Sequence, residues 1–498
     1  MFKFRIILKQ AMICFIALLL LGSTFPFQSY ASTTQQPNLP NKIDQYIQKM
    51  MTEYQIPGLS IALVHHDKTV YSHGWGITGG KKTAVTSDTP FALGSLSKSL
   101  TGLAIVKLIE EKKMELDKPI QTYIPWFTLQ DKKASSQITV RHLLAQTSGI
   151  STYSGLEISD QGSLEPDAIK KNVKKLSSVE LNSAPGATHQ YSAANYLILG
   201  AIIEEITNMP YADYMEQEIF VPLQMKHAAS DYEKSLANGY LSGFQSWFGV
   251  PKPSKVMYDN SGAPYGYITA SAKDMAQYLK AVINGNDVIN GESHKLFLSP
   301  LVERKPDQWY GFGWRTSKIS DSETMIWHAG STPDSRAEIL LNPKTGWGLV
   351  ILTNKDHIFE EPRLTYVAKE IMKMVNGEVP DELPKATATE QWIVSGVVLV
   401  LLLTAIGLFI RLQKHKPTQK VRMLWFILGF GLVLLAIGLI PALTYILDSP
   451  WRALEMFAPD IAFLTYIGVM LLASKGLIAI LISLEKFRKS NKTTKITS

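Results

Sequence analysis

The pattern of apolar and polar residues predicts strands at both ends of a long segment of this chain, with helices between them. Two pairs of short apolar, β-prone runs are each joined by a few polar residues and predict two β-hairpins, at 59–65 with 69–75 and at 337–341 with 346–352. Helical spacing of apolar residues predicts helices at 41–54, 140–145, 195–206, 270–283 and 364–375. This order predicts an α+β fold, an α/β sandwich in which helices flank an antiparallel sheet that carries an inserted, mostly helical lobe.

Three long apolar runs follow this segment. They cover 392–410, 423–447 and 461–484, and only the third contains a charge, Lys475. The first run of 19 residues would extend about 28 Å as a helix, which is enough to cross the hydrocarbon core of a bilayer. The sequence therefore predicts three transmembrane helices within 392–484. Lys475 is expected either to extend toward the membrane surface, to face a neighbouring helix or to serve a function.

The N-terminus has the pattern of a secretory signal. Lys3, Arg5 and Lys9 precede an apolar run over 11–22, and Ser29-Tyr-Ala31 places small residues at the first and third positions of a cleavage site. We expect residues 1–31 to be a signal peptide, although the same run could also remain as a membrane anchor. The only cysteine, Cys14, lies in this run, so the mature protein would contain no disulfide, thiolate metal site or cysteine nucleophile.

The charge is distributed unevenly along the chain. Residues 1–31 carry +3, residues 32–390 carry −4 and residues 391–498 carry +8, which gives the net +7 of the whole chain. Basic residues gather between the first two apolar runs and in the tail at 485–498, and such loops face the cytoplasm. We expect a multi-pass plasma-membrane protein with an extracytoplasmic domain over 32–385, a linker at 386–391 and a basic cytoplasmic tail. The mildly acidic domain lacks the basic patch of a nucleic-acid-binding protein.

A serine and a lysine three residues apart form the strongest candidate for chemistry. Ser95 and Lys98 precede an apolar stripe from Leu100 to Ile109, which predicts an amphipathic helix. If Ser95 begins this helix, the two side chains lie on one face and can meet. A lysine can remove a serine proton only if its pKa is lowered, as burial near a helix N-terminus would do. The alternative is an ordinary helix N-cap serine, and the same spacing at Ser483 lies at the end of an apolar run.

Two later segments supply candidate partners. Tyr191-Ser-Ala193 follows a Pro-Gly turn and precedes a predicted helix, where a tyrosine can project into a cleft and move a proton. Trp327-His-Ala-Gly-Ser331 comes just before a predicted strand, and His328 could donate to a carboxylate or support proton transfer. Each residue also has a plain structural interpretation, as a packing aromatic or a surface histidine.

In this order the three segments resemble the penicillin-recognising serine hydrolases, in particular the class C β-lactamase-like group. The stretches 138–149, 266–275 and 310–314 also match that group's pattern, so the resemblance covers about 40–375. It implies that Ser95 is acylated and that Lys98 and Tyr191 share the proton transfers. It also implies that His328-Ala-Gly330 stands where relatives have Lys-Thr-Gly, and that the backbone amides of Ser95 and Ser331 form the oxyanion hole. The family needs no metal or organic cofactor.

Two positions depart from the family pattern. Ala193 stands where relatives have an asparagine that holds the substrate amide, and Asn195 lies two residues too late to replace it. Asp334 occupies a position where relatives often have glycine. Both changes argue against efficient β-lactam hydrolysis more than against acyl transfer.

The expected function is a serine hydrolase of D-alanyl esters or amides in the cell envelope. One alternative is a catalytically weak protein that binds penicillin or cell-wall peptides as a sensor or scaffold. In another, the membrane helices transport or signal and the outer domain only presents a ligand. The expected partners are an ester or amide substrate and the plasma membrane, with no nucleic acid. The sequence leaves open the oligomeric state and the choice between Lys98 and Tyr191 as the base.

Overall fold

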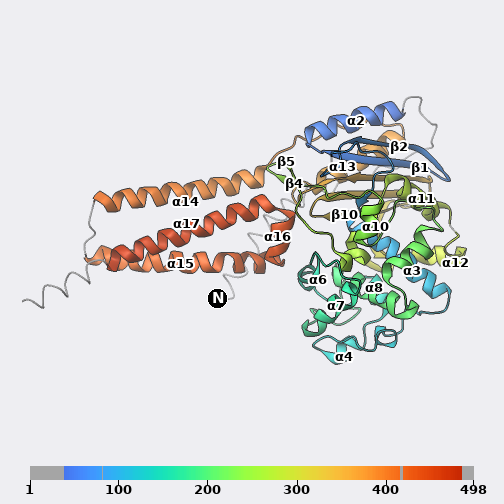
Figure 1. The fold of residues 1–498 in the computed structure, drawn as a ribbon, viewed down its shortest axis with the longest axis horizontal. Coiled ribbons are helices and arrows are strands. Elements are labelled where there is room, and N and C mark those ends of the chain that lie inside the picture. The colour runs from blue at the N-terminus through green and yellow to red at the C-terminus, as the bar shows by residue number, and fades with distance from the viewer. Residues whose placement is uncertain (1–38, 81, 286, 415–418, 485–498) are drawn as a thin grey trace, which may run out of the picture.

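The computed structural model describes residues 39–80, 82–285, 287–414 and 419–484. It places three long helices at one side of a body made of sheet and helices (Figure 1). The predicted signal peptide at 1–31 and the predicted tail at 485–498 lie outside the described residues.

An eight-stranded antiparallel sheet forms the centre of the body. Its order is β2-β1-β12-β11-β10-β9-β8-β7, with bounds β1 Gly58–His65, β2 Lys68–Gly76, β7 Val302–Lys305, β8 Gln308–Gly311, β9 Trp314–Ser320, β10 Glu323–Thr332, β11 Ser335–Asn342 and β12 Trp347–Thr353. Both predicted hairpins are confirmed, because β1 pairs with β2 and β11 pairs with β12. The two hairpins also join each other through β1 and β12, although almost the whole domain separates them in the sequence.

Helices cover both faces of the sheet. On one face α2 (Leu39–Glu53) and α13 (Glu361–Val375) pack against apolar side chains such as Ile61 and Ile351. The other face holds the larger core, to which α3 (Ser97–Glu110), α8 (Ala193–Thr207) and α11 (Ala272–Asn284) contribute. Figure 1 shows these two layers above and below the strands. The predicted α+β sandwich is therefore confirmed.

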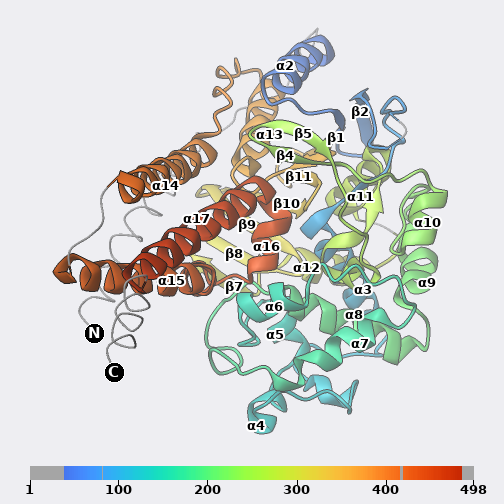
Figure 2. The same ribbon diagram turned by 60° about the vertical axis from the view of Figure 1, so that its left-hand side comes forward.

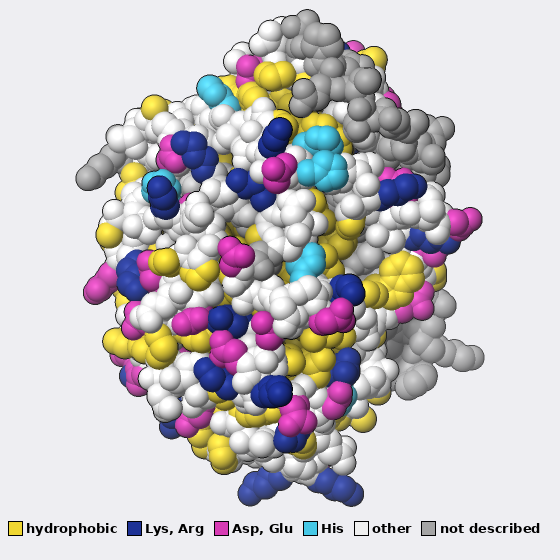
Figure 3. All heavy atoms as spheres, turned by 90° about the vertical axis from the view of Figure 1, so that its right-hand side faces the viewer, with side chains coloured by type: hydrophobic (Ala, Val, Ile, Leu, Met, Phe, Trp, Pro, Cys, Tyr) yellow, Lys and Arg dark blue, Asp and Glu magenta, His cyan; other side chains and the backbone are white. Residues whose placement is uncertain are grey.

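The segment between β2 and β7 forms the predicted helical lobe. Its other helices are α4 Lys132–Ser135, α5 Val140–Leu144, α6 Thr152–Ile158, α7 Ala168–Lys174, α9 Tyr211–Met215, α10 Tyr232–Ala237 and α12 Gly291–Leu298. The short strands β3 (Phe91–Ala92) and β6 (Thr269–Ala270) pair with each other, and β4 (Phe244–Trp247) pairs with β5 (Val250–Pro253) and β13 (Lys355–Asp356). On the face turned away from the long helices, basic and acidic side chains are interspersed (Figure 3).

Helix α3 differs from the prediction. It was expected to be amphipathic, but every residue from Ser97 to Val106 is buried. Its polar residues are tolerated because their hydroxyls find partners inside the protein: Ser99 donates to the Leu96 carbonyl at 2.9 Å and Thr101 to the Pro264 carbonyl at 2.7 Å. The helix lies between the sheet and the lobe, and only its last turn, from Lys107 to Glu110, has partly exposed residues.

Among the described residues, three helices are long and apolar enough to cross a membrane: α14 (Thr389–Lys414), α15 (Gln419–Leu447) and α17 (Pro459–Leu484). They correspond to the three predicted runs. Lys475 on α17 donates to the Thr404 hydroxyl on α14 at 2.6 Å, which fits the expectation that it faces a helix partner. A further short helix, α16 (Trp451–Phe457), precedes α17 and lies where the long helices meet the body (Figure 1).

Candidate active site

Ser95 and Lys98 meet at the start of α3. Ser95 belongs to the 3₁₀ turn η2 (Gly94–Leu96), which leads directly into the helix. The Lys98 Nζ atom lies 2.9 Å from the Ser95 hydroxyl and 2.6 Å from the Tyr265 carbonyl. The Ser-x-x-Lys spacing therefore produces a direct contact between the candidate nucleophile and the candidate base.

The Lys98 side chain is unusually placed for a cation, because it is only 1% exposed. Burial lowers its pKa, Arg315 adds to this effect, and Tyr191 and Asp160 oppose it. Its nitrogen lies 5.0 Å from the centre of the Tyr191 ring and 5.7 Å from that of Tyr265. These surroundings favour a neutral amine at lower pH than for a lysine in water, which is the form that can accept the Ser95 proton.

Two glycines bring β10 against the nucleophile turn. Gly94 has a φ of +54°, and a Cβ atom there would lie 2.2 Å from the Ser331 nitrogen. A Cβ on Gly330 would lie 2.0 Å from the Leu93 carbonyl oxygen and 2.9 Å from the Ser95 nitrogen. Only glycine permits this approach. It places the backbone amides of Ser95 and Ser331 on neighbouring segments, as an oxyanion hole requires.

Tyr191 forms a wall of the site just before α8. The Thr152 hydroxyl donates to the Tyr191 carbonyl at 2.8 Å, and the next amide, that of Ser192, donates to the Gln146 side chain at 3.0 Å. The loop at 146–152 thus fixes the backbone of Tyr191 from two sides. The Tyr191 hydroxyl is buried and makes no hydrogen bond of ordinary geometry with another described residue. It is therefore free to bind a substrate or to transfer a proton.

His328 lies on β10 itself rather than just before a strand. Alternation along β10 turns His328 and Gly330 toward the lobe, while Trp327 and Ser331 face α13. The Nδ1 atom of His328 lies 2.6 Å from the Ala329 carbonyl, which can only accept, so Nδ1 carries the proton. Burial lowers the pKa of His328 well below its usual range, and Arg315 and Lys98 add to this.

The neutral His328 ring therefore offers a bare Nε2 atom, which is buried and has no partner among the described residues. This differs from the expectation that His328 could donate to a carboxylate. A histidine in this state accepts a hydrogen bond and does not supply the positive charge of the lysine found in relatives.

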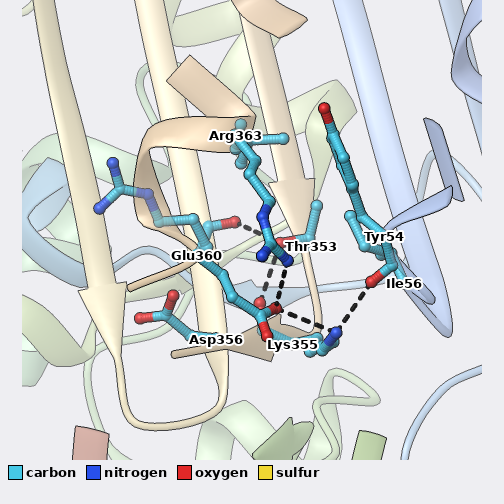
Figure 4. A pocket seen from close by; sticks show the side chains of 9 residues that line it. Tyr54, Ile56, Thr353, Lys355, Asp356, Glu360 and Arg363 are labelled. Carbon is cyan, nitrogen blue, oxygen red and sulfur yellow. Dashed lines mark hydrogen bonds and ion pairs between the residues drawn. The ribbon is translucent and has the colours of Figure 1, made fainter. Parts of the chain in front are cut away.

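An ionic cluster on the opposite face of the sheet holds the side chain of Ser331. The Ser331 hydroxyl donates to Glu361 and accepts from Arg336, both at 2.7 Å, and Arg336 pairs with Glu338 at 2.7 Å. The same cluster continues around a small cavity where Lys355 and Arg363 contact Glu360 (Figure 4). Ser331 is thus anchored by its side chain while its backbone faces the nucleophile.

Two arginines near the site were not predicted from the sequence. The Arg315 guanidinium lies 5.6 Å from the centre of the Tyr191 ring and 5.1 Å from that of Trp327. Burial lowers the pKa of Arg304, and the positive charge of Arg315 adds to this effect. Neither pairs with a carboxylate among the described residues. The position of Arg315, directly after the 310–314 motif, was the one sequence signal that could have indicated it.

The structure shows where Ala193 and Asp334, the two positions that depart from the family pattern, lie and what surrounds them. Ala193 begins α8, and Asn195 is fully buried, where it hydrogen-bonds Gln146 and Ser148. Asn195 therefore does not replace the missing asparagine. Asp334 lies in the turn between β10 and β11 and accepts from the Gly243 amide at 2.9 Å, so its carboxylate holds a neighbouring loop.

Comparison with known proteins accords with this arrangement. A family model described as Beta-lactamase matches residues 43–373. The chain belongs to the beta-lactamase family. Among its relatives, Protein flp of Staphylococcus aureus (strain MW2) is 30% identical over 317 residues, which cover 63% of this chain and 62% of that protein. Penicillin-binding protein 4 of Amycolatopsis lactamdurans is 25% identical over 321 residues, covering 61% of this chain and 82% of that protein.

A solved structure has the same fold as this beta-lactamase-family protein. The octameric penicillin-binding protein homologue from Pyrococcus abyssi aligns with a TM-score of 0.59 at 24% identity, covering 69% of this chain and 78% of that chain. This family is generally one of serine hydrolases. Within the described residues, no three His, Cys, Asp or Glu side chains are grouped so that they could hold a metal ion.

Proposed function

We propose that this protein is a membrane-anchored, extracytoplasmic serine hydrolase that forms an acyl-enzyme at Ser95. The observation that carries the proposal is the 2.9 Å contact between Ser95 and the buried Lys98 amine. A neutral Lys98 takes the hydroxyl proton as Oγ attacks an ester or amide carbonyl. The amides of Ser95 and Ser331 donate to the oxyanion, and each such donor contributes about 3 kcal/mol in other serine hydrolases.

The proton that Lys98 takes from Ser95 is then passed to the leaving group. Lys98, directly or through the Tyr191 hydroxyl, protonates the leaving oxygen or nitrogen, and the carbonyl carbon stays bonded to Ser95 Oγ. A water molecule then attacks the acyl carbon and gives a proton to Lys98. Lys98 passes this proton to Ser95 Oγ as the bond between the acyl carbon and Oγ breaks, which releases the acid and restores the serine hydroxyl and the neutral amine. Tyr191 suits the role of relay because its hydroxyl is buried and unpartnered among the described residues.

The proposed substrates are D-alanyl esters or amides of the cell envelope, with esters on anionic wall polymers favoured. Arg304 and Arg315 support an anionic substrate, because their guanidinium groups have no carboxylate partner among the described residues. Ala193 supports an ester, since an ester does not need the side-chain amide that relatives offer to a substrate amide. The three apolar helices would hold the enzyme at the membrane, within reach of the wall.

Labelling of the full-length protein in detergent with a fluorescent fluorophosphonate tests this function. We expect a covalent adduct on Ser95, located by mass spectrometry, that is absent in Ser95→Ala. Ser483→Ala is the matched control, because Ser483 has the same Ser-x-x-Lys spacing but lies at the end of α17. Equal labelling of the Ser95→Ala variant would remove Ser95 from its role.

A catalytically weak sensor or scaffold is the second candidate. It is favoured by Ala193 together with the locked position of Asn195, which leave the substrate amide without its usual partner. Adduct that forms on Ser95 with a fluorescent penicillin and persists for hours, with no turnover of D-alanyl esters, would select this alternative.

A further inference from the structure

The loop between the second and third long helices reaches into the hydrolase body. Figure 2 shows α16 between these helices and α6. A single side chain of α16, that of Arg452, donates to four backbone carbonyls around the end of α6: Asp160 at 2.7 Å, Glu157 at 3.0 Å, Leu156 at 3.2 Å and Ser159. Carbonyls at a helix C-terminus lack partners within the helix and attract a cation, so Arg452 completes this helix end.

Asp160 connects this contact to the active site. Its backbone is in the left-handed region, with a φ of +54°. Its carboxylate accepts from the Tyr267 hydroxyl at 2.6 Å. Burial raises the pKa of Asp160 to about 6, and Asp259 raises it too, while Tyr267, Arg452 and Lys98 favour the ionised form. Asp160 thus interacts with two cations: Arg452 of α16, which belongs to the membrane segment formed by α14, α15, α16 and α17, and Lys98, the candidate base of the active site.

Tyr267 ends the short helical turn η7 (Ala263–Tyr267), which forms the wall opposite α3. The Tyr265 carbonyl of this turn accepts from Lys98 at 2.6 Å. The Pro264 carbonyl accepts from Thr101 at 2.7 Å, and the Ile268 amide that follows donates to Ser97 at 3.2 Å. The position of η7 therefore determines where the Lys98 nitrogen is held.

We propose that Arg452 and Asp160 are positioning residues, through which the membrane segment completes the active site of the hydrolase. Arg452 fixes the end of α6 and Asp160, Asp160 holds Tyr267, and η7 then holds Lys98 against Ser95. The three long helices with α16 are thus part of the catalytic unit as well as an anchor. This inference rests on the proposed role of Lys98.

Removal of Arg452 alone should leave α16 in place, because other contacts hold its surroundings. The Ile358 amide donates to the Phe457 carbonyl at 2.9 Å, and Gln245 donates to the Met456 carbonyl at 2.7 Å. His357 and Asp460 form a fully buried contact at 2.9 Å. A substitution at Arg452 therefore tests its link to Asp160 rather than the docking of the whole helix.

The first test measures acylation of the full-length protein in detergent by a fluorophosphonate as a function of pH. We expect Arg452→Gln and Asp160→Asn to lower the second-order rate constant roughly tenfold on its high-pH plateau, where Lys98 is neutral in every variant. Arg452→Lys should recover part of the loss, because lysine keeps the charge but reaches fewer carbonyls. Glu455→Gln is the matched control and should behave as wild type, since Glu455 lies on the same helix but contacts Tyr466.

The pH midpoint separates a positioning role from a general loss of stability. The charged or titratable groups that face Lys98 are Tyr191, Arg315, Asp160, His328, Tyr196 and Tyr265. Those that act on Asp160 are Tyr267, Tyr265, Asp259, Arg452 and Lys98. Without Arg452, Asp160 is protonated more readily and stabilises the Lys98 ammonium less. The rise of the rate with pH should therefore move to lower pH in Arg452→Gln. A lower rate with an unchanged midpoint would overturn the proposal.

Hydrogen exchange provides a test that does not need catalysis. The amides of Ala263 and of residues 265–268 should exchange faster in Arg452→Gln than in wild type and in Glu455→Gln. Unchanged exchange would overturn the inference. If the wild type is not labelled at Ser95 but exchange changes as expected, the proposed function fails while the structural coupling stands. If the wild type is labelled and both readouts stay constant in Arg452→Gln, the coupling fails alone.

Discussion

Lys98 donates from one buried nitrogen to Ser95 at 2.9 Å and is held on the other side by the Tyr265 carbonyl at 2.6 Å. The contact with Ser95 joins residues three apart in the sequence, whereas the contact with Tyr265 spans the inserted lobe. The nitrogen is therefore aimed by a distant segment, and its protonation is controlled by the burial that this segment creates.

Acylation should be faster at higher pH. The proposed reaction needs neutral Lys98, and burial lowers the pKa of this amine. The neutral fraction therefore grows as the pH rises through a value below the ordinary lysine pKa of about 10.4. The rate constant for acylation by an activated ester should follow this rise and be lost as the pH falls. A midpoint at or above that ordinary value would contradict the assignment.

Lys98→Arg should abolish acylation, because a guanidinium does not lose its proton in proteins. Lys107→Arg provides the control on the same helix, where Lys107 forms ion pairs with Glu111 and Glu218 far from the nucleophile. Rapid-mixing measurements of adduct formation would compare the two variants. An active Lys98→Arg protein would make Tyr191 the stronger candidate for the base.

Ala193→Asn should increase acylation by β-lactams and leave ester turnover nearly unchanged. The new side chain could donate to a substrate amide carbonyl, and one such hydrogen bond contributes about 0.5–1.5 kcal/mol. This corresponds to a gain of roughly two- to twelvefold for amides. Ala193→Val adds bulk without an amide and serves as control. An unchanged β-lactam rate in Ala193→Asn would show that position 193 does not face the substrate amide.

Arg315→Gln should reduce kcat/KM for an ester that carries a phosphate group about tenfold more than for a neutral ester of the same leaving group. The expected difference reflects one charge-assisted hydrogen bond, partly weakened by solvent. Lys305→Gln removes an exposed positive charge from β7 and controls for the overall field of the protein. Equal losses with both esters would remove Arg315 from substrate binding.

A protease added to intact protoplasts should digest the hydrolase domain and spare a tag placed after Ser498. This follows from the basic loop and tail, which are expected to face the cytoplasm. In lysed protoplasts both parts should be cut. Loss of the tag in intact protoplasts would overturn the proposed orientation.

Local sequence determined the three long apolar helices, the two β-hairpins and several helices of this protein, but it did not predict strands β7, β8, β9 and β10 or the pairing of β1 with β12. The apolar runs of β1 and β12 could be recognised because strands buried on both faces are continuously apolar. The three long apolar helices were equally evident, since a bilayer demands length and an absence of charge. The contact between Ser95 and Lys98 was predictable because residues three apart share a helix face.

Tertiary structure alone decided the environment of these residues. Helix α3 is buried on all sides from Ser97 to Val106 because the lobe folds back over it, which its apolar stripe did not indicate. The tautomer of His328 depends on the Ala329 carbonyl beside it in β10, and its lowered pKa depends on burial and on two cations, Arg315 of β9 and Lys98 of α3. Arg315 approaches Tyr191, and Arg452 reaches Asp160, only after segments far apart in the chain have packed together. Desolvation and long-range contacts arise from this packing, so no local pattern of residues encodes them.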